Sequence, residues 1–156
     1  MNKNYKTILA AGLTAGVLDI LAAILVYAVI LNIATAKSVL QSIASGIHGK
    51  EAYNGGWSTA ILGLAIHFMI ALIFAAIFVL LYPNLKKLIP NAVVLGILYG
   101  CLVWLIMNCL VVPFSAIGRW PKWNFGFTHL PLAVLILIVC VGLPISLITA
   151  KMYKVR

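Results

Sequence analysis

Four apolar runs constrain the fold of this chain more than any other feature, because each exceeds the ~18 residues that indicate a membrane span. Inside a bilayer the backbone must satisfy its own hydrogen bonds, and a helix does so within one segment. The runs therefore predict an all-α integral membrane four-helix bundle that forms a single domain over residues 1–156. The predicted spans are residues 8–34, 57–82, 92–114 and 129–150.

The composition also indicates a chain surrounded by lipid. Hydrophobic residues make up 65% of the sequence and charged residues only 8%, whereas a soluble domain has about 25% charged residues. A net charge of +9 would suggest nucleic acid binding in a soluble protein. Here the basic residues flank the apolar runs, where they meet anionic head groups. We therefore expect membrane lipids as partners and no nucleic acid.

The basic residues also predict the orientation of the bundle. Four spans place both termini on one side, together with the connection between the second and third spans. That side has an excess of basic residues, which marks the cytoplasmic side of a membrane protein. We therefore predict cytoplasmic N- and C-termini. The basic residues on this side are Lys3, Lys6, Lys86, Lys87, Lys151, Lys154 and Arg156.

The first apolar run has a second interpretation as a secretory signal. Lys3 and Lys6 precede it, and Ala34-Thr35-Ala36 resembles a cleavage site. A signal core is about 7–15 residues long, and this run is longer and contains an aspartate. We therefore favour a retained helix.

The connection between the first two spans, residues 35–56, has an amphipathic beginning. Its apolar residues at positions 39, 40, 43, 44 and 47 repeat at helical spacing, with polar residues between them. This pattern predicts a short helix that lies in the membrane interface.

Asp19 lies in the middle of the first run, where a carboxyl group costs roughly 2.5–3.5 kcal/mol on an insertion scale. With a helical rise of ~1.5 Å per residue, Asp19 lies about 16 Å from one edge of its span, and His67 about 15 Å from the opposite edge of the next. Both depths are near the midplane of a ~30 Å hydrocarbon core. We predict that Asp19 and His67 form a buried polar pair. The pair is either a relay for protons or cations or a structural hydrogen bond between two helices.

Five glycines are candidates for close helix packing, because small residues let membrane helices approach each other. The glycines of the first two spans lie on the helix faces that carry Asp19 and His67. The two in the first span lie at the depth of the two in the third. We therefore predict that these two spans touch through their glycine faces, within one chain or across a homo-oligomer. The candidates are Gly12, Gly16, Gly63, Gly96 and Gly100.

A set of polar and cationic residues gathers at the end of the bundle opposite the termini. This outer mouth could receive an anionic head group or a small anion, or it could be an ordinary interfacial belt. For Asn108 we favour a further interpretation, in which it satisfies backbone groups left free near Pro113. The outer-mouth candidates are His48, Asn108, Arg119, Lys122 and His129.

The sequence contains no recognisable catalytic, metal or cofactor site. Asp19 and His67 could supply two members of a catalytic triad, but no serine lies at their level on a neighbouring span. A haem would need two histidines at one depth, and His67 and His129 are roughly 15 Å apart by helical rise. Zinc would lack a third and fourth ligand at one level. We therefore expect no enzymatic activity, no metal and no cofactor.

Sparse motifs cover a little over half of the chain, mainly from His67 onward. They comprise Gly63, His67-Phe68, Tyr82-Pro83, Gly96, Gly100, Val112-Pro113, Gly118, Pro121 and His129. Through these residues the chain resembles the YagU-like family of small bacterial inner-membrane proteins, although its connection between the first two spans is shorter. The resemblance implies a bacterial inner-membrane location and a link to acid tolerance. It implies no particular activity or substrate.

These observations together predict a small multi-pass membrane protein that moves protons or small ions by means of Asp19 and His67. The alternative is a structural or accessory membrane protein that binds lipid or a partner helix.

Overall fold

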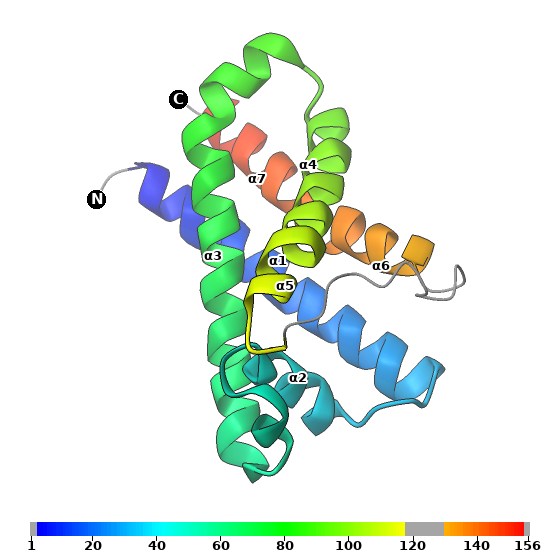
Figure 1. Ribbon diagram of the computed structural model, residues 1–156. Helices are drawn as coiled ribbons and strands as arrows, with labels where there is room; N and C mark the ends of the chain where they lie inside the picture. Colours follow the sequence, from blue (N-terminus) through cyan, green and yellow to red (C-terminus); the bar gives the residue numbers. More distant parts are fainter. Residues whose placement is uncertain (1–2, 118–129, 155–156) are drawn as a thin grey trace.

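The computed structural model describes residues 3–117 and 130–154, and its long elements are all helical (Figure 1). The first span comprises α1 (Lys3–Ile24) and the π-helical turn η1 (Leu25–Ile30). It leads through α2 (Ala36–His48) and the 3-10 turn η2 (Gly49–Tyr53) to the second span, α3 (Gly56–Leu88). The third span comprises α4 (Ala92–Ile106), the π-helical turn η3 (Met107–Val111) and α5 (Val112–Phe114). The fourth comprises α6 (Leu130–Leu137), the π-helical turn η4 (Ile138–Gly142) and α7 (Leu143–Lys154).

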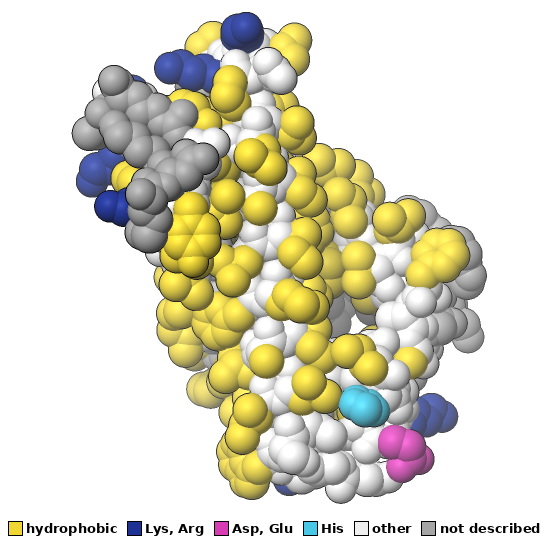
Figure 2. Space-filling model, turned by 90° about the vertical axis from the view of Figure 1, so that its left-hand side faces the viewer, with side chains coloured by type: hydrophobic (Ala, Val, Ile, Leu, Met, Phe, Trp, Pro, Cys, Tyr) yellow, Lys and Arg dark blue, Asp and Glu magenta, His cyan; other side chains and the backbone are white. Residues whose placement is uncertain are grey.

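Four helical segments in the described ranges are long and apolar enough to cross a membrane, so the chain is a multi-pass membrane protein. They form an all-α bundle in which both termini and the α3–α4 connection lie toward one end and α2 lies at the other (Figure 1). Large apolar side chains are exposed along every span. Figure 2 shows them covering the face along α3. Such continuous apolar exposure suits lipid rather than water.

The first span ends at Ile30, earlier than the predicted residue 34. Thr35 and Ser38 form a capping box: the Ser38 N–H donates to Thr35 Oγ1 over 3.1 Å, and the Thr35 N–H donates to Ser38 Oγ over 2.7 Å. This cap starts a new helix at Ala36 and leaves residues 31–35 as the turn before it.

The prediction that the second span ends at Tyr82 was wrong, because α3 continues through Pro83 to Leu88. Proline has no N–H, so Pro83 cannot donate to the carbonyl group of Val79 one turn earlier. The hydroxyl group of Tyr153, on α7, donates to this carbonyl group instead, over 3.4 Å. The ring of Tyr153 also packs edge-to-face on Tyr82. A side chain from another span therefore stabilises the helix where the local sequence predicts a break.

The predicted helix between the first two spans is present as α2, and it packs along the beginning of α3. A Cβ atom at Gly63 would collide with the carbonyl group of Leu40, so glycine permits the two backbones to touch. Gln41 is only 3% exposed. Its Nε2 donates to the Gly56 carbonyl group over 2.9 Å and lies 3.2 Å from Thr59 Oγ1. Backbone contact and a buried amide thus hold α2 against the second span.

The glycine faces join different pairs of spans from those predicted. A Cβ atom at Gly12 or Gly16 would lie 2.8 Å from a side chain of α3, the second span. On the third span, Gly96 and Gly100 contact the fourth span, where Gly142 lies against both of them. The predicted contact between the first and third spans was therefore wrong within the chain. Equal depth does not make two helices neighbours, and here each glycine face is covered by another span.

The packed core lies in the half of the bundle nearer the termini. Its members come from the middle of α1, the second half of α3, the length of α4 and the second half of the fourth span. Phe78 and Ile145 are fully buried there. Tyr99 is 7% exposed, and its hydroxyl group donates to the Phe74 carbonyl group over 2.7 Å. The other half of the bundle, nearer α2, contains the cavities.

Candidate functional site

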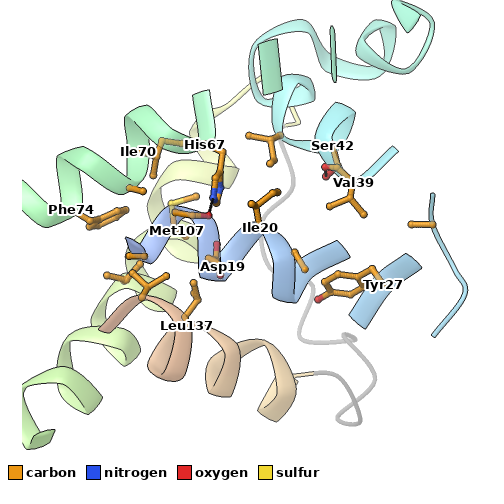
Figure 3. Close-up of a pocket in the computed structure, with 18 of the residues that line it drawn as sticks. Asp19, Ile20, Tyr27, Val39, Ser42, His67, Ile70, Phe74, Met107 and Leu137 are labelled. Atoms are coloured by element: carbon orange, nitrogen blue, oxygen red, sulfur yellow. Dashed lines mark hydrogen bonds between the residues drawn. The ribbon is translucent and has the colours of Figure 1, made fainter. Parts of the chain in front are cut away.

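Asp19 and His67 line one cavity of about 640 Å³ inside the bundle. Figure 3 shows Asp19 reaching it from α1 and His67 from α3, with Met107 and Leu137 adding the third and fourth spans. Ser42 brings α2 to the same space. The polar groups predicted from depth alone therefore share a cavity to which every span contributes.

His67 is held by a backbone group rather than by the carboxyl group of Asp19. Its Nε2 lies 2.8 Å from the carbonyl oxygen of Gly16 on α1 (Figure 3). A carbonyl oxygen can only accept, so Nε2 carries the hydrogen, and Nδ1 of the neutral ring is an acceptor. Gly16 lies almost one helical turn before Asp19, so the ring remains within electrostatic range of the carboxyl group. Asp19 and His67 are thus neighbours without a hydrogen bond between them.

The Asp19 carboxyl group has no hydrogen-bond or ion-pair partner among residues 3–117 and 130–154. Its side chain is only half-buried. It lines both the large cavity and a second cavity of about 420 Å³. A buried charge without a partner is strongly disfavoured. In this half-buried, mainly apolar setting, the carboxyl group is expected to be protonated, to be hydrated or to face a cation that enters the cavity.

Asn108 belongs to the second cavity, together with Asp19 and Trp104. Its Nδ2 donates to the Trp104 carbonyl group over 3.0 Å. This contact satisfies the Trp104 carbonyl group, one turn earlier in the helix. The predicted partner was a backbone group left free near Pro113. Asn108 thus shares the second cavity with Asp19 and does not line the cavity that contains His67.

The large cavity has a closed end and an open end. Phe74, Val103 and Val141 line its inner end and are also members of the packed core. At the other end it is lined by Ile33 and Tyr53, which are 68% and 48% exposed. Among the described residues, the cavity therefore opens on the side of α2, and core residues separate it from the terminal half of the bundle.

No protein-family model, curated protein or solved structure matches this chain. The function is therefore argued from the two cavities and the groups that line them. Their walls are mainly hydrocarbon. The polar side chains among the described lining residues are Asp19, His67, Asn108, Trp104 with its indole N–H, and several serine and tyrosine residues.

The remaining outer-mouth candidates do not join this site in the described part of the chain. His48 is exposed at the end of α2 and lines neither cavity. Arg119, Lys122 and His129 lie outside the described residues. Within the described ranges, no three His, Cys, Asp or Glu residues are grouped so that they could hold a metal ion.

Sequence reasoning missed several lining residues. Tyr27 follows Asp19 at a spacing of two helical turns, with Ala23 between them, and all three line both cavities. This spacing was a usable signal, because residues four apart share a helix face. Met107 and Leu137 gave no comparable signal, since their place in the wall depends on which spans are neighbours.

Proposed function

We propose that this protein moves protons or small cations across the membrane, with Asp19 as the group that takes up and releases them. The observation that supports this most strongly is a carboxyl group without a partner in the described structure, placed in a cavity that opens beside Tyr53. Ionisable groups in the middle of a span are costly and usually serve a function. A carboxyl group that is accessible from one side can exchange its proton with that side.

His67 is proposed to assist this exchange. The bond from Nε2 to the Gly16 carbonyl group fixes the ring beside the cavity. Nδ1 can then accept a proton, which creates a cation next to Asp19. A proton that enters the cavity therefore has two acceptors of different chemistry within one space.

Passage to the other side of the membrane would require the inner end of the cavity to open. Phe74, Val103 and Val141 separate the cavity from the terminal half of the bundle. Val141 lies in η4, where π-helical geometry replaces the regular helix. Such turns frequently occur at functional sites. We propose that the fourth span moves at η4 to expose Asp19 to the opposite side.

The proposed location is a bacterial inner membrane, with both termini in the cytoplasm. Lys86, Lys87, Lys151 and Lys154 lie at the end of the bundle that carries the termini, as the positive-inside rule requires for this orientation. The resemblance to the YagU-like family suggests the same membrane and a role in acid tolerance, which a proton pathway would fit. Lipids, and a second copy of the chain, are the proposed partners of the apolar outer surface.

A structural role is the second candidate, and one observation favours it. The bond between His67 and Gly16 ties α3 to α1 across the glycine contact. If this were the purpose of the polar groups, His67 would matter for stability and Asp19 would be secondary.

Proton flux into liposomes tests the proposed function. We expect the purified parent protein to acidify vesicles that contain a pH-sensitive dye faster than empty vesicles do, when an inward proton gradient is imposed. Asp19→Asn should reduce the flux to that of empty vesicles, because an amide cannot exchange a proton, and His67→Ala should slow it. Glu51→Gln is the matched control, since Glu51 is the only other acidic side chain and lines neither cavity. Equal flux in all variants, at the level of empty vesicles, would contradict transport.

A further inference from the structure

We infer that the substrate of the large cavity is an amphipathic organic monocation, such as an amine or onium ion with apolar substituents. This rests on the proposed function, because it assigns to Asp19 the role of binding the cation as well as the proton. The structural basis is one carboxyl group in a roomy apolar cavity with aromatic walls. Size, charge and wall chemistry each restrict the ligand.

The size of the cavity exceeds what protons or single ions need. About 640 Å³ falls in the range of about 300–1,000 Å³ typical of small-molecule sites. The walls carry large apolar side chains, of which Ile20, Ile70, Met107 and Leu137 are shown in Figure 3. Methionine adds a polarisable, adaptable surface that accepts ligands of varied shape.

Inorganic cations fit these walls poorly. Hard cations bind where several oxygen atoms replace their water shell. Asp19 is the only carboxylate among the described lining residues. The Gly16 carbonyl group already accepts from His67. An organic cation with apolar substituents is weakly hydrated and loses little on entering, while burial of its apolar surface is favourable.

The charge of the ligand follows from the charged groups that line the cavity. Asp19 supplies one negative charge, and no lysine or arginine lines either cavity in the described part of the chain. Tyr27 and Phe74 present aromatic rings to the same space and appear on either side of Asp19 in Figure 3. Aromatic faces attract organic cations. The site therefore complements a single positive charge.

Proton and cation would compete for the same carboxylate. The described titratable groups that share the large cavity with Asp19 are His67 of α3, Tyr27 of the same span and Tyr53 of η2, and Cys140 of η4 lies within electrostatic range. A proton on the Asp19 carboxyl group removes the negative charge that would pair with the cation. Binding of the cation should therefore weaken as pH falls, and binding should release a proton.

A pair of probes with the same shape and opposite charge tests the inference. Titration calorimetry would compare tetraphenylphosphonium with tetraphenylborate on the purified protein in detergent. We expect the parent to bind the phosphonium at least about tenfold more tightly than the borate, because only the cation pairs with Asp19. Asp19→Asn should lose at least about tenfold in phosphonium affinity and should no longer release a proton on binding. Excess sodium or potassium chloride should not displace the phosphonium.

Variants that keep the carboxyl group provide an independent test. Ala23 lines both cavities, whereas its neighbour Ala22 lines neither. Ala23→Phe should abolish phosphonium binding by filling the space, and Ala22→Phe should leave it unchanged.

Besides absent phosphonium binding, three results would overturn the substrate inference. These are equal affinity for the two probes, unchanged phosphonium binding in Asp19→Asn, and displacement of the phosphonium by sodium or potassium. If phosphonium binding is absent but proton flux still depends on Asp19, the substrate inference fails and the proposed function stands. If Asp19-dependent binding occurs without any proton flux, the binding site stands and the proposed transport fails.

Discussion

Replacing Asp19 with leucine is expected to stabilise the protein. A carboxyl group at the centre of a span costs roughly 2.5–3.5 kcal/mol, whereas leucine is favourable there. The substitution removes no hydrogen bond or ion pair between residues that the structure describes. We expect the free energy of unfolding to rise by about 1 kcal/mol or more, together with complete loss of proton flux. Thermal unfolding in detergent, followed by tryptophan fluorescence, measures the change.

The matched control for this substitution is Thr14→Leu, since Thr14 is an exposed polar residue of the same helix. It separates the effect of adding a leucine from that of removing the buried carboxyl group. A stabilised but inactive Asp19→Leu variant would show that the carboxyl group is retained for function at a cost in stability. A clear loss of stability in Asp19→Leu, with none in Thr14→Leu, would contradict this prediction, because it would mean that the carboxyl group itself stabilises the fold.

Replacing Gly142 with alanine is expected to destabilise the protein strongly. A Cβ atom at this position would collide with the Gly96 carbonyl group and lie 2.6 Å from the Gly100 amide nitrogen. These are backbone atoms, so the third and fourth spans must move apart. Overpacking of this kind costs about 1–3 kcal/mol. The expected result is a lower unfolding temperature in the same thermal assay.

Gly46→Ala is the matched control, because among the described residues a Cβ atom there would meet only the Ser115 side chain, at 3.9 Å. Alanine favours a helix over glycine by up to about 1 kcal/mol, so this variant should be at least as stable as the parent. If Gly142→Ala were equally stable, the contact between the third and fourth spans would differ from the one described.

The sequence was sufficient to predict the four spans, because hydropathy and length follow from composition along a single segment. It also placed α2 from apolar spacing, and it placed Asp19 and His67 at one level from helical rise alone. These features depend on local periodicity. They require no knowledge of which helices are neighbours.

The features that the sequence did not predict depend on tertiary contacts. Pro83 predicts a helix end, but α3 continues through it. Tyr153, which lies 74 residues after Val79, donates to the Val79 carbonyl group that the proline leaves free. The predicted contact between the first and third spans was wrong because nothing in the local sequence marks Gly142 as the residue against which Gly96 and Gly100 pack. The cavity was missed for the same reason, since it forms where bulky side chains from separate spans fail to meet.

The hydrogen bond of His67 shows the same limit at the site itself. Helical rise predicts the His67 ring at the level of Asp19. The actual acceptor of its hydrogen bond is the Gly16 carbonyl group, which is accessible because glycine has no side chain. Sequence periodicity identifies side chains on a face and does not indicate which backbone group they reach.

The central claim is that Asp19 is a protonatable carboxyl group accessible from the cavity, and carbodiimide labelling tests it most directly. Dicyclohexylcarbodiimide is an apolar reagent that adds to a protonated carboxyl group to form an N-acylurea. The chain has only two acidic side chains, so mass spectrometry can assign the adduct to Asp19 or Glu51. We predict an adduct on Asp19 that increases as pH falls and that stops proton flux. An unlabelled Asp19 across the pH range, in protein that is folded and inserted in lipid, would contradict the account.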